Sequence, residues 1–198
     1  MMGNWRRVLW LGILAAVMAV AIAGYVVNRS NQQQASTAPV LGSAFSLIDS
    51  DGAAITEAAF FGRPTVLFFG FTQCPEICPV SLFEISTLMD ELGPEKRDLQ
   101  AFFISVDPER DSPAVMGEYI APFGENIRGI TGPLSAIETL AQSWGVYIKK
   151  VPIDDGDYTV DHTASVFLVD RHGQFRGTIA YRENHQIALD KLRLLASL

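Results

Sequence analysis

Two cysteines lie where an apolar run changes into a helical pattern, and this junction constrains the fold more than any other stretch of the chain. Residues 65–71 are almost wholly apolar and predict a buried strand. Residues 80–92 carry apolar side chains at helical spacing and predict a helix. Cys74 and Cys78 lie between them, so the sequence predicts a strand that leads through the cysteines into a helix.

The position of the two cysteines determines their chemistry. The first N–H groups of a helix lack partners within the helix and the helix dipole is positive there, so the thiolate is favoured over the thiol. A spacing of four residues lets Cys74 and Cys78 lie on one face of a helical turn, close enough to share a metal ion or to form a disulfide. The motif is therefore competent for soft-metal binding and for thiol–disulfide exchange.

Length, charge and cysteine count limit the classes of function. With 198 residues and a hydrophobic fraction of 48%, the chain can hold one membrane segment and one domain with a sizeable core. All 22 acidic residues follow residue 27, against 13 of the 15 basic residues, so we expect no binding to nucleic acid. The sequence holds 2 cysteines, and such close neighbours cannot connect distant parts of a fold. They indicate a site and not a structural framework.

The N-terminal residues predict a membrane anchor. Residues 8–27 form an uncharged apolar run that, as a helix, would span about 30 Å, the hydrocarbon thickness of a bilayer. Arg6 and Arg7 precede it, so the positive-inside rule keeps the N-terminus in the cytoplasm and exports the rest of the chain. The alternative is a cleaved signal peptide, since residues 21–23 read Ala-Ile-Ala. We favour a retained anchor because apolar residues continue past that pattern.

The chain is expected to have three parts. Residues 1–27 are the N-terminal membrane anchor, which crosses the inner (cytoplasmic) membrane once. Residues 28–39 are polar, rich in Gln, Ser and Ala, and predict a flexible linker. Residues 40–198 are the folded domain, which we place on the exported, periplasmic side.

Strands and helices alternate along the folded domain. We expect a hairpin at 45–55, strands at 65–71, 99–106, 127–130, 146–151, 165–169 and 175–179, and helices at 80–92, 113–123, 133–144 and 185–195. This order implies an α/β domain whose sheet has parallel pairing at its centre and helices on both faces. A cysteine motif directly after a central strand resembles the thioredoxin arrangement, although the spacing here is Cys-x-x-x-Cys.

A metal bound by two thiolates needs a further ligand, and His162 is the best candidate. It follows Asp161 immediately before the strand expected at 165–169. In the thioredoxin fold the loop at this place faces the cysteines and usually carries a cis-proline, whereas this chain has no proline after Pro152. His172 and His185 are expected to be surface residues, because one lies in a turn and the other begins the last helix.

Three segments together resemble the signature blocks of the Sco (SenC/PrrC) family. They are residues 70–79, which contain the cysteines, residues 104–113, which read Ile-Ser-Val-Asp-Pro-Glu-Arg-Asp-Ser-Pro, and residues 158–163, which contain His162. Members of that family are membrane-anchored copper proteins with a thioredoxin-like fold that help to assemble cytochrome c oxidase. The resemblance covers about residues 40 to 195, and the anchor and linker match the family's layout.

The resemblance assigns roles to individual residues. It implies that Cys74, Cys78 and His162 bind copper. Asp107 and Asp161 match acidic positions of the family blocks, and we expect them, Asp161 above all, to support the ligands without binding the metal. Glu76, between the cysteines, replaces the family's usual aspartate and keeps its charge.

Copper also suits these residue types independently of the resemblance. Two thiolates and an imidazole form a soft ligand set that fits Cu(I) and accepts Cu(II) with an added ligand, whereas zinc usually takes a fourth donor. We therefore expect a copper metallochaperone that delivers the ion to the dinuclear copper site of cytochrome c oxidase. Its expected partners are the copper-accepting oxidase subunit and a copper donor or thiol reductant protein.

A thiol–disulfide reductase is the alternative function. In that role Cys74 and Cys78 would be the catalytic residues, Cys74 would attack, and the cysteines of a partner would be kept reduced. Both functions can coexist, because the sulfurs must be reduced before they bind copper. Peroxide reduction is a weaker third hypothesis, since Leu67 and Phe71 replace the proline and threonine of the Pro-x-x-x-Thr-x-x-Cys pattern.

Overall fold

The computed structural model describes residues 42–198, together with residues 10, 11 and 18. The predicted anchor at 1–27 and the predicted linker at 28–39 therefore lie almost wholly outside the described residues. Within the described part, no helix is both long and apolar enough to cross a membrane. Residues Val40–Leu198 form one compact unit of the chain, and the fold below is that of this unit.

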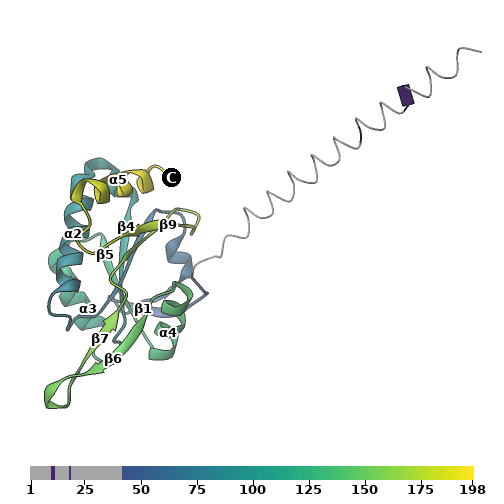
Figure 1. Ribbon diagram of the computed structural model, residues 1–198. Coiled ribbons are helices and arrows are strands. Elements are labelled where there is room, and N and C mark those ends of the chain that lie inside the picture. Colours follow the sequence, from purple (N-terminus) through teal and green to yellow (C-terminus); the bar gives the residue numbers. More distant parts are fainter. Residues whose placement is uncertain (1–9, 12–17, 19–41) are drawn as a thin grey trace, which may run out of the picture. The chain divides into compact units, whose positions relative to one another are not determined.

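A central mixed sheet organises the domain (Figure 1). Within the described residues it has seven strands in the order β2-β1-β5-β4-β3-β8-β9. The strands β3, β4 and β5 are parallel, and all other pairs are antiparallel. Their bounds are Ser46–Asp49 (β1), Ala54–Thr56 (β2), Thr65–Gly70 (β3), Gln100–Ser105 (β4), Ile127–Thr131 (β5), Val166–Val169 (β8) and Phe175–Ile179 (β9). The expected parallel centre and the expected N-terminal hairpin are confirmed.

Helices cover both faces of this sheet. In Figure 1, α2 (Ile77–Glu91), α3 (Pro113–Ile120) and α5 (His185–Ala196) lie on one side, and α4 (Leu134–Ser143) lies on the other. Short 3-10 turns complete the chain at Glu57–Phe60 (η1), Gly93–Asp98 (η2), Ala121–Phe123 (η3) and Asp154–Gly156 (η4). The two central strands β3 and β4 are buried along their whole length, which explains why they read as continuous apolar runs.

The start of α3 follows from its sequence. Ser112 has extended backbone angles, and its side chain accepts a hydrogen bond from the N–H of Val115. Pro113 occupies the first helical position, where its missing N–H costs nothing. The predicted cap is therefore confirmed. It fixes the residue at which the loop 107–111 ends and α3 begins.

Two features near the cysteines and His162 differ from the sequence-based predictions. The helix α2 begins at Ile77, three residues before the predicted start, so Cys78 belongs to its first turn. Residues Tyr158–His162 form a strand, β7, where a loop was predicted. That prediction was wrong because these residues pair with β6 (Ile148–Pro152). The two strands form an antiparallel sheet of their own, separate from the central sheet. Figure 1 shows this β6–β7 hairpin extending from one end of the central sheet.

Candidate metal centre

Both cysteines follow β3, at the carboxyl end of the central parallel strands. Cys78 lies in the first turn of α2 and is fully buried, whereas Cys74 precedes the helix and is 9% exposed. The N–H of Cys78 donates to the sulfur of Cys74 at 3.3 Å. An unpaired helix N–H thus finds a sulfur acceptor, which is the electrostatic arrangement that favours a thiolate.

Gly70 allows this close packing. A Cβ at this last residue of β3 would lie 2.8 Å from the sulfur of Cys78 and 2.6 Å from the Phe103 ring. Any larger residue would therefore push the helix start away from the strand. The site needs glycine here for space and not for a special backbone angle.

Asp111 holds the loop between β3 and the cysteines. Its buried carboxylate accepts hydrogen bonds from the N–H and the hydroxyl of Thr72, the latter at 2.6 Å, and from the hydroxyl of Ser105 at 2.6 Å. Burial raises the pKa of this carboxyl, although its three donors oppose that effect. Sequence reasoning missed Asp111. The sequence offered one indication of its importance: Asp111 lies in residues 104–113, a block of the family resemblance that contains none of the predicted ligands.

His162 reaches the sulfurs from the end of β7. Its Nε2 lies 3.6 Å from the sulfur of Cys78, and its Nδ1 lies 3.0 Å from the carbonyl oxygen of Thr163. A carbonyl oxygen can only accept, so Nδ1 carries the proton and the Nε2 lone pair points toward the cysteines. The imidazole also contacts the edge-on rings of Phe71 and Phe68, at centroid distances of 5.8 and 6.4 Å.

The three predicted ligands therefore meet at one point. One ligand atom from each of Cys74, Cys78 and His162 lies within 4.8 Å of the other two. Two sulfurs and one imidazole nitrogen at these distances can bind a single soft or borderline metal ion, and the set suits copper.

The two thiols differ in their pKa values. A hydrogen bond from the Cys78 side chain lowers the pKa of Cys74 to about 4, although burial opposes this shift. The pKa of Cys78 is raised, first because its proton is held by Cys74 and then because the side chain is buried. The surroundings therefore favour a thiolate at Cys74 and a protonated thiol at Cys78.

A surface cleft gives access to the site. It has a volume of about 480 Å³, and its lining includes Cys74, His162, Phe71, Ile77 and Tyr147. Cys78 lies behind this lining. A partner molecule that enters the cleft would therefore meet Cys74 and His162 first.

The two acidic residues that were expected to support the ligands take different positions. Asp107 is fully buried, and its carboxylate accepts a hydrogen bond from the Tyr158 hydroxyl at 2.7 Å. The same carboxylate forms an ion pair with Arg110. Asp161 is exposed and pairs in register with Lys149 across the hairpin. The acceptor of the His162 Nδ1 proton is the Thr163 carbonyl. A supporting role for Asp161 stays a prediction.

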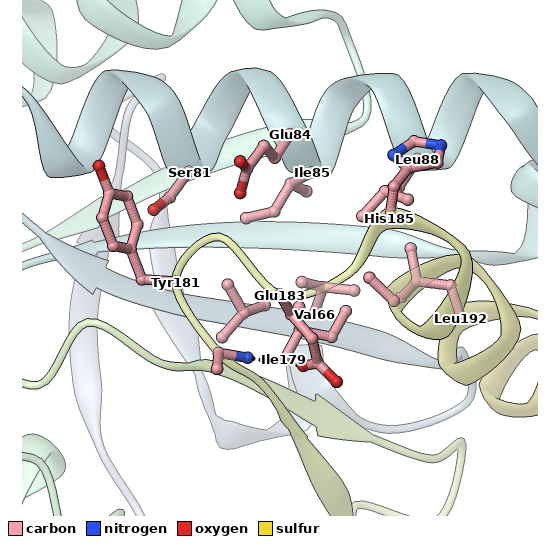
Figure 2. Close-up of a pocket in the computed structure, with 13 residues that line it drawn as sticks. Val66, Ser81, Glu84, Ile85, Leu88, Ile179, Tyr181, Glu183, His185 and Leu192 are labelled. Atoms are coloured by element: carbon pink, nitrogen blue, oxygen red, sulfur yellow. Dashed lines mark hydrogen bonds between the residues drawn. The ribbon is translucent and has the colours of Figure 1, made fainter.

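A second cavity lies apart from this centre, between α2 and the β9–α5 connection (Figure 2). It is small, about 70 Å³, and the hydroxyls of Ser81 and Tyr181 border it without a hydrogen-bond partner in the protein. None of the three predicted ligands lines it. His185, which does line it, pairs with Glu91 at 3.0 Å, and His172 lies exposed in the β8–β9 turn.

A parallel-centred α/β domain with a Cys-x-x-x-Cys helix start and a facing histidine defines a class of thioredoxin-like metal-binding proteins. Residues 33–197 match the model of the SCO1/SenC family. The chain belongs to that family, which confirms the resemblance inferred from the three sequence blocks.

Similarity to individual proteins agrees with this assignment. Protein sco1 of Schizosaccharomyces pombe is 35% identical over 187 residues, which cover 87% of this chain and 71% of the relative. The chain spans between 44% and 71% of the length of the curated relatives that it matches.

Solved structures of relatives share the fold. The structure of Bradyrhizobium japonicum ScoI with copper bound has 42% sequence identity and a TM-score of 0.73, and the match covers 78% of this chain and 99% of that one. Yeast Sco1 with copper bound has 33% identity and a TM-score of 0.73, over 79% of this chain and 88% of that one. The α/β thioredoxin-like fold is therefore confirmed, and both of these relatives hold copper.

Proposed function

We propose that this chain is a copper metallochaperone that binds the ion through Cys74, Cys78 and His162 and delivers it to the dinuclear copper site of cytochrome c oxidase. The observation that carries the proposal is the convergence of these three side chains within 4.8 Å, although residue 162 is far from the cysteines in sequence. Family membership and the copper-bound structures of two relatives support it.

The donor set suits an ion that must be bound and then released. Two sulfurs and an imidazole satisfy Cu(I) at low coordination number and leave room for an added ligand on Cu(II). Cys74 is already a thiolate, so binding needs the loss of one proton, from Cys78. Cys74 and His162 line the cleft, so a recipient can replace them one at a time while the buried Cys78 still holds the ion.

Location and partners complete the proposal. Residues 8–27 would anchor the chain in the inner membrane with the domain on the periplasmic side, where the oxidase subunit that receives copper is accessible. A copper donor or a thiol reductant would have to reach the same cleft, because its lining gives access to the ligands. The acidic balance of the domain again argues against nucleic acid as a partner.

Copper titration of the full chain in detergent tests the ligand set. With a chromophoric Cu(I) competitor, we expect one ion per chain, and we expect Cys74→Ala, Cys78→Ala and His162→Ala each to weaken binding by at least about tenfold. His172→Ala is the matched control, because His172 lies in the β8–β9 turn and should leave the affinity unchanged. Unchanged binding in His162→Ala would remove the histidine from the site.

Delivery is tested in cells that lack the protein. We expect loss of cytochrome c oxidase activity and of oxidase-bound copper, with partial recovery when copper is added to the medium. If cells without the protein kept normal oxidase activity and normal oxidase-bound copper, copper delivery to the oxidase would be excluded as its function.

Thiol–disulfide exchange is the second candidate function, and the lowered pKa of Cys74 favours it. A thiolate at the edge of a cleft can attack a partner's disulfide, and Cys78 at its side can then release the mixed disulfide. Reduction of an oxidised peptide from the copper-accepting subunit by the reduced chain would support this role. A pair of cysteines that stays reduced in the presence of that peptide would argue against it.

A further inference from the structure

We propose that the loop 107–111, between β4 and α3, is a positioning element that fixes the His162 imidazole relative to the two sulfurs and thereby sets the copper affinity. This inference rests on the proposed copper site and names the residues that hold its two halves together. The loop binds no metal itself. It acts through Thr72 on the cysteine side and through Tyr158 on the histidine side.

The cysteine side is held by the last residue of the loop. The buried Asp111 carboxylate binds the N–H and the hydroxyl of Thr72, two residues before Cys74. Its own main-chain carbonyl accepts from the Thr131 hydroxyl at 2.7 Å, which ties the loop to β5. The segment that leads into the cysteines is therefore bonded to a loop that is itself fixed to the sheet.

The histidine side is held by the first residues of the loop. The Tyr158 hydroxyl donates to buried Asp107 at 2.7 Å, and the Arg110 guanidinium, which pairs with the same carboxylate, donates to the Tyr158 carbonyl at 3.0 Å. Tyr158 is the first residue of β7 and His162 is the last. One end of the strand is thus clamped to the loop while the other presents the imidazole.

Aromatic contacts connect the two sides. The Arg110 guanidinium lies 3.9 Å from the centre of the Tyr158 ring and 6.0 Å from that of Phe71. Phe71 directly precedes Thr72, and its ring contacts the His162 imidazole at 5.8 Å. The contacts form a closed circuit that runs from the loop to β7, to the imidazole, to Phe71 and back to the loop.

The β6–β7 hairpin needs such an anchor because it is a sheet of two strands, a unit that is marginally stable by itself. Hydrogen bonds between Tyr147 and Thr163 close it at the base, and Val160 packs into the core. These contacts hold the hairpin in place, while the bonds at Tyr158 fix the direction of β7. A small rotation of β7 would move Nε2 away from a sulfur that lies 3.6 Å from it.

A double-mutant cycle separates positioning from general stabilisation. Tyr158→Phe removes the hydroxyl bond to Asp107 but keeps the ring that Arg110 covers. We expect it to weaken copper binding by the full chain about tenfold, as is typical when a group that orients a ligand is removed. In a His162→Ala background the same change should alter affinity by less than about twofold, because no imidazole is left to misplace.

Glu109→Gln is the matched control within the same loop. Glu109 pairs with Lys150 on the hairpin at 2.5 Å, but both side chains are exposed, so the pair contributes little. We expect this variant to bind copper like the unchanged chain. A loss equal to that of Tyr158→Phe would show that any contact between loop and hairpin suffices, and would overturn the assignment to the Asp107–Arg110–Tyr158 group.

A metal-free readout keeps this test independent of the proposed function. The ring protons of His162 lie in the ring-current field of Phe71, so their NMR shifts in the apo protein report the imidazole position. We expect a shift change in Tyr158→Phe and none in Glu109→Gln. If the chain bound no copper, the proposed function would fail while the apo shifts still tested positioning. Unchanged shifts in Tyr158→Phe, or an equal copper-affinity loss with and without His162, would refute the inference.

Discussion

At the scale of single residues, the candidate metal centre is asymmetric. Cys74 is a thiolate at the edge of the cleft, and Cys78 is a buried thiol that donates to it. The imidazole has its proton fixed on Nδ1 by the Thr163 carbonyl, so Nε2 is free for the metal. The three candidate ligands therefore differ chemically, because Cys74 favours the thiolate, Cys78 favours the thiol and the His162 Nε2 is an acceptor.

The asymmetry predicts how Cys74 reacts with an alkylating reagent. Because its pKa is lowered to about 4, the side chain is a thiolate above that pH, and its alkylation rate should stay nearly constant from pH 8 down to about 5 and fall below it. Iodoacetamide labelling followed by mass spectrometry measures this profile for each cysteine. Cys78 should remain unlabelled across the same range.

A pair of variants checks the cause of the lowered pKa. Its largest contribution is the hydrogen bond from the Cys78 side chain, so Cys78→Ala should move the alkylation profile of Cys74 toward higher pH. Cys78→Ser keeps a donor at the same place and should move the profile less. Identical profiles for the two variants would contradict this explanation and leave the helix start as the main cause.

Sequence reasoning selected the three side chains that converge at the candidate metal centre but not the groups that orient them. Cys74, Cys78 and His162 are chemically distinctive residues, so their types and spacing were enough to select them. The Thr163 carbonyl carries no sequence signal, because every residue has one. Asp111 looks like any loop carboxylate until its three donors are seen around it.

At the scale of elements, the site is a junction of three segments: the β3–α2 loop, the β4–α3 loop and the β7 strand. The β3–α2 loop and the β7 strand carry the candidate ligands, and the β4–α3 loop carries buried carboxylates. Asp107 and Asp111 are both fully buried, which is costly for carboxylates unless donors surround them. The β4–α3 loop is therefore expected to be a point of structural weakness when either residue is changed.

Asp111→Ala should destabilise the fold. Removal of the carboxylate leaves the N–H and hydroxyl of Thr72 and the hydroxyl of Ser105 without their acceptor, and we expect a loss of about 3 kcal/mol in the free energy of unfolding. Urea unfolding of the apo protein measures this loss. Asp111→Asn keeps an acceptor for Thr72 and should cost clearly less, so equal losses in the two variants would contradict the hydrogen-bond account.

The element pattern was predictable where burial alone dictates it. The strands β3 and β4 are buried on both faces, and their apolar runs identified them directly. The strand β7 was missed because it is half exposed, short and polar, and because its partner β6 has exposed lysines in place of an apolar face. The start of α2 was placed late because Glu76 caps it without a side-chain hydrogen bond, so no capping signal marked it.

At the scale of the whole molecule, the chain combines an acidic folded unit with a strongly apolar N-terminal run. The candidate metal centre opens through a cleft on the folded unit, so the proposed function requires ion exchange on the side of the membrane where that unit lies. The charges before the apolar run predict which side this is. Topology is therefore part of the proposed function and can be tested separately from copper binding.

We expect the mature chain to keep residues 1–27 and to remain in the membrane fraction after alkaline carbonate extraction. The reason is that residues 8–27 are long and apolar enough to fill a bilayer, while Arg6 and Arg7 hold the N-terminus inside. Protease added to spheroplasts should then digest the domain. Arg6→Glu combined with Arg7→Glu should lower the digestible fraction, because the charge bias that orients the segment is removed. A mature chain that begins at Gly24 and is released by carbonate would instead identify the segment as a cleaved signal peptide, and would require the chaperone to find its recipient by diffusion.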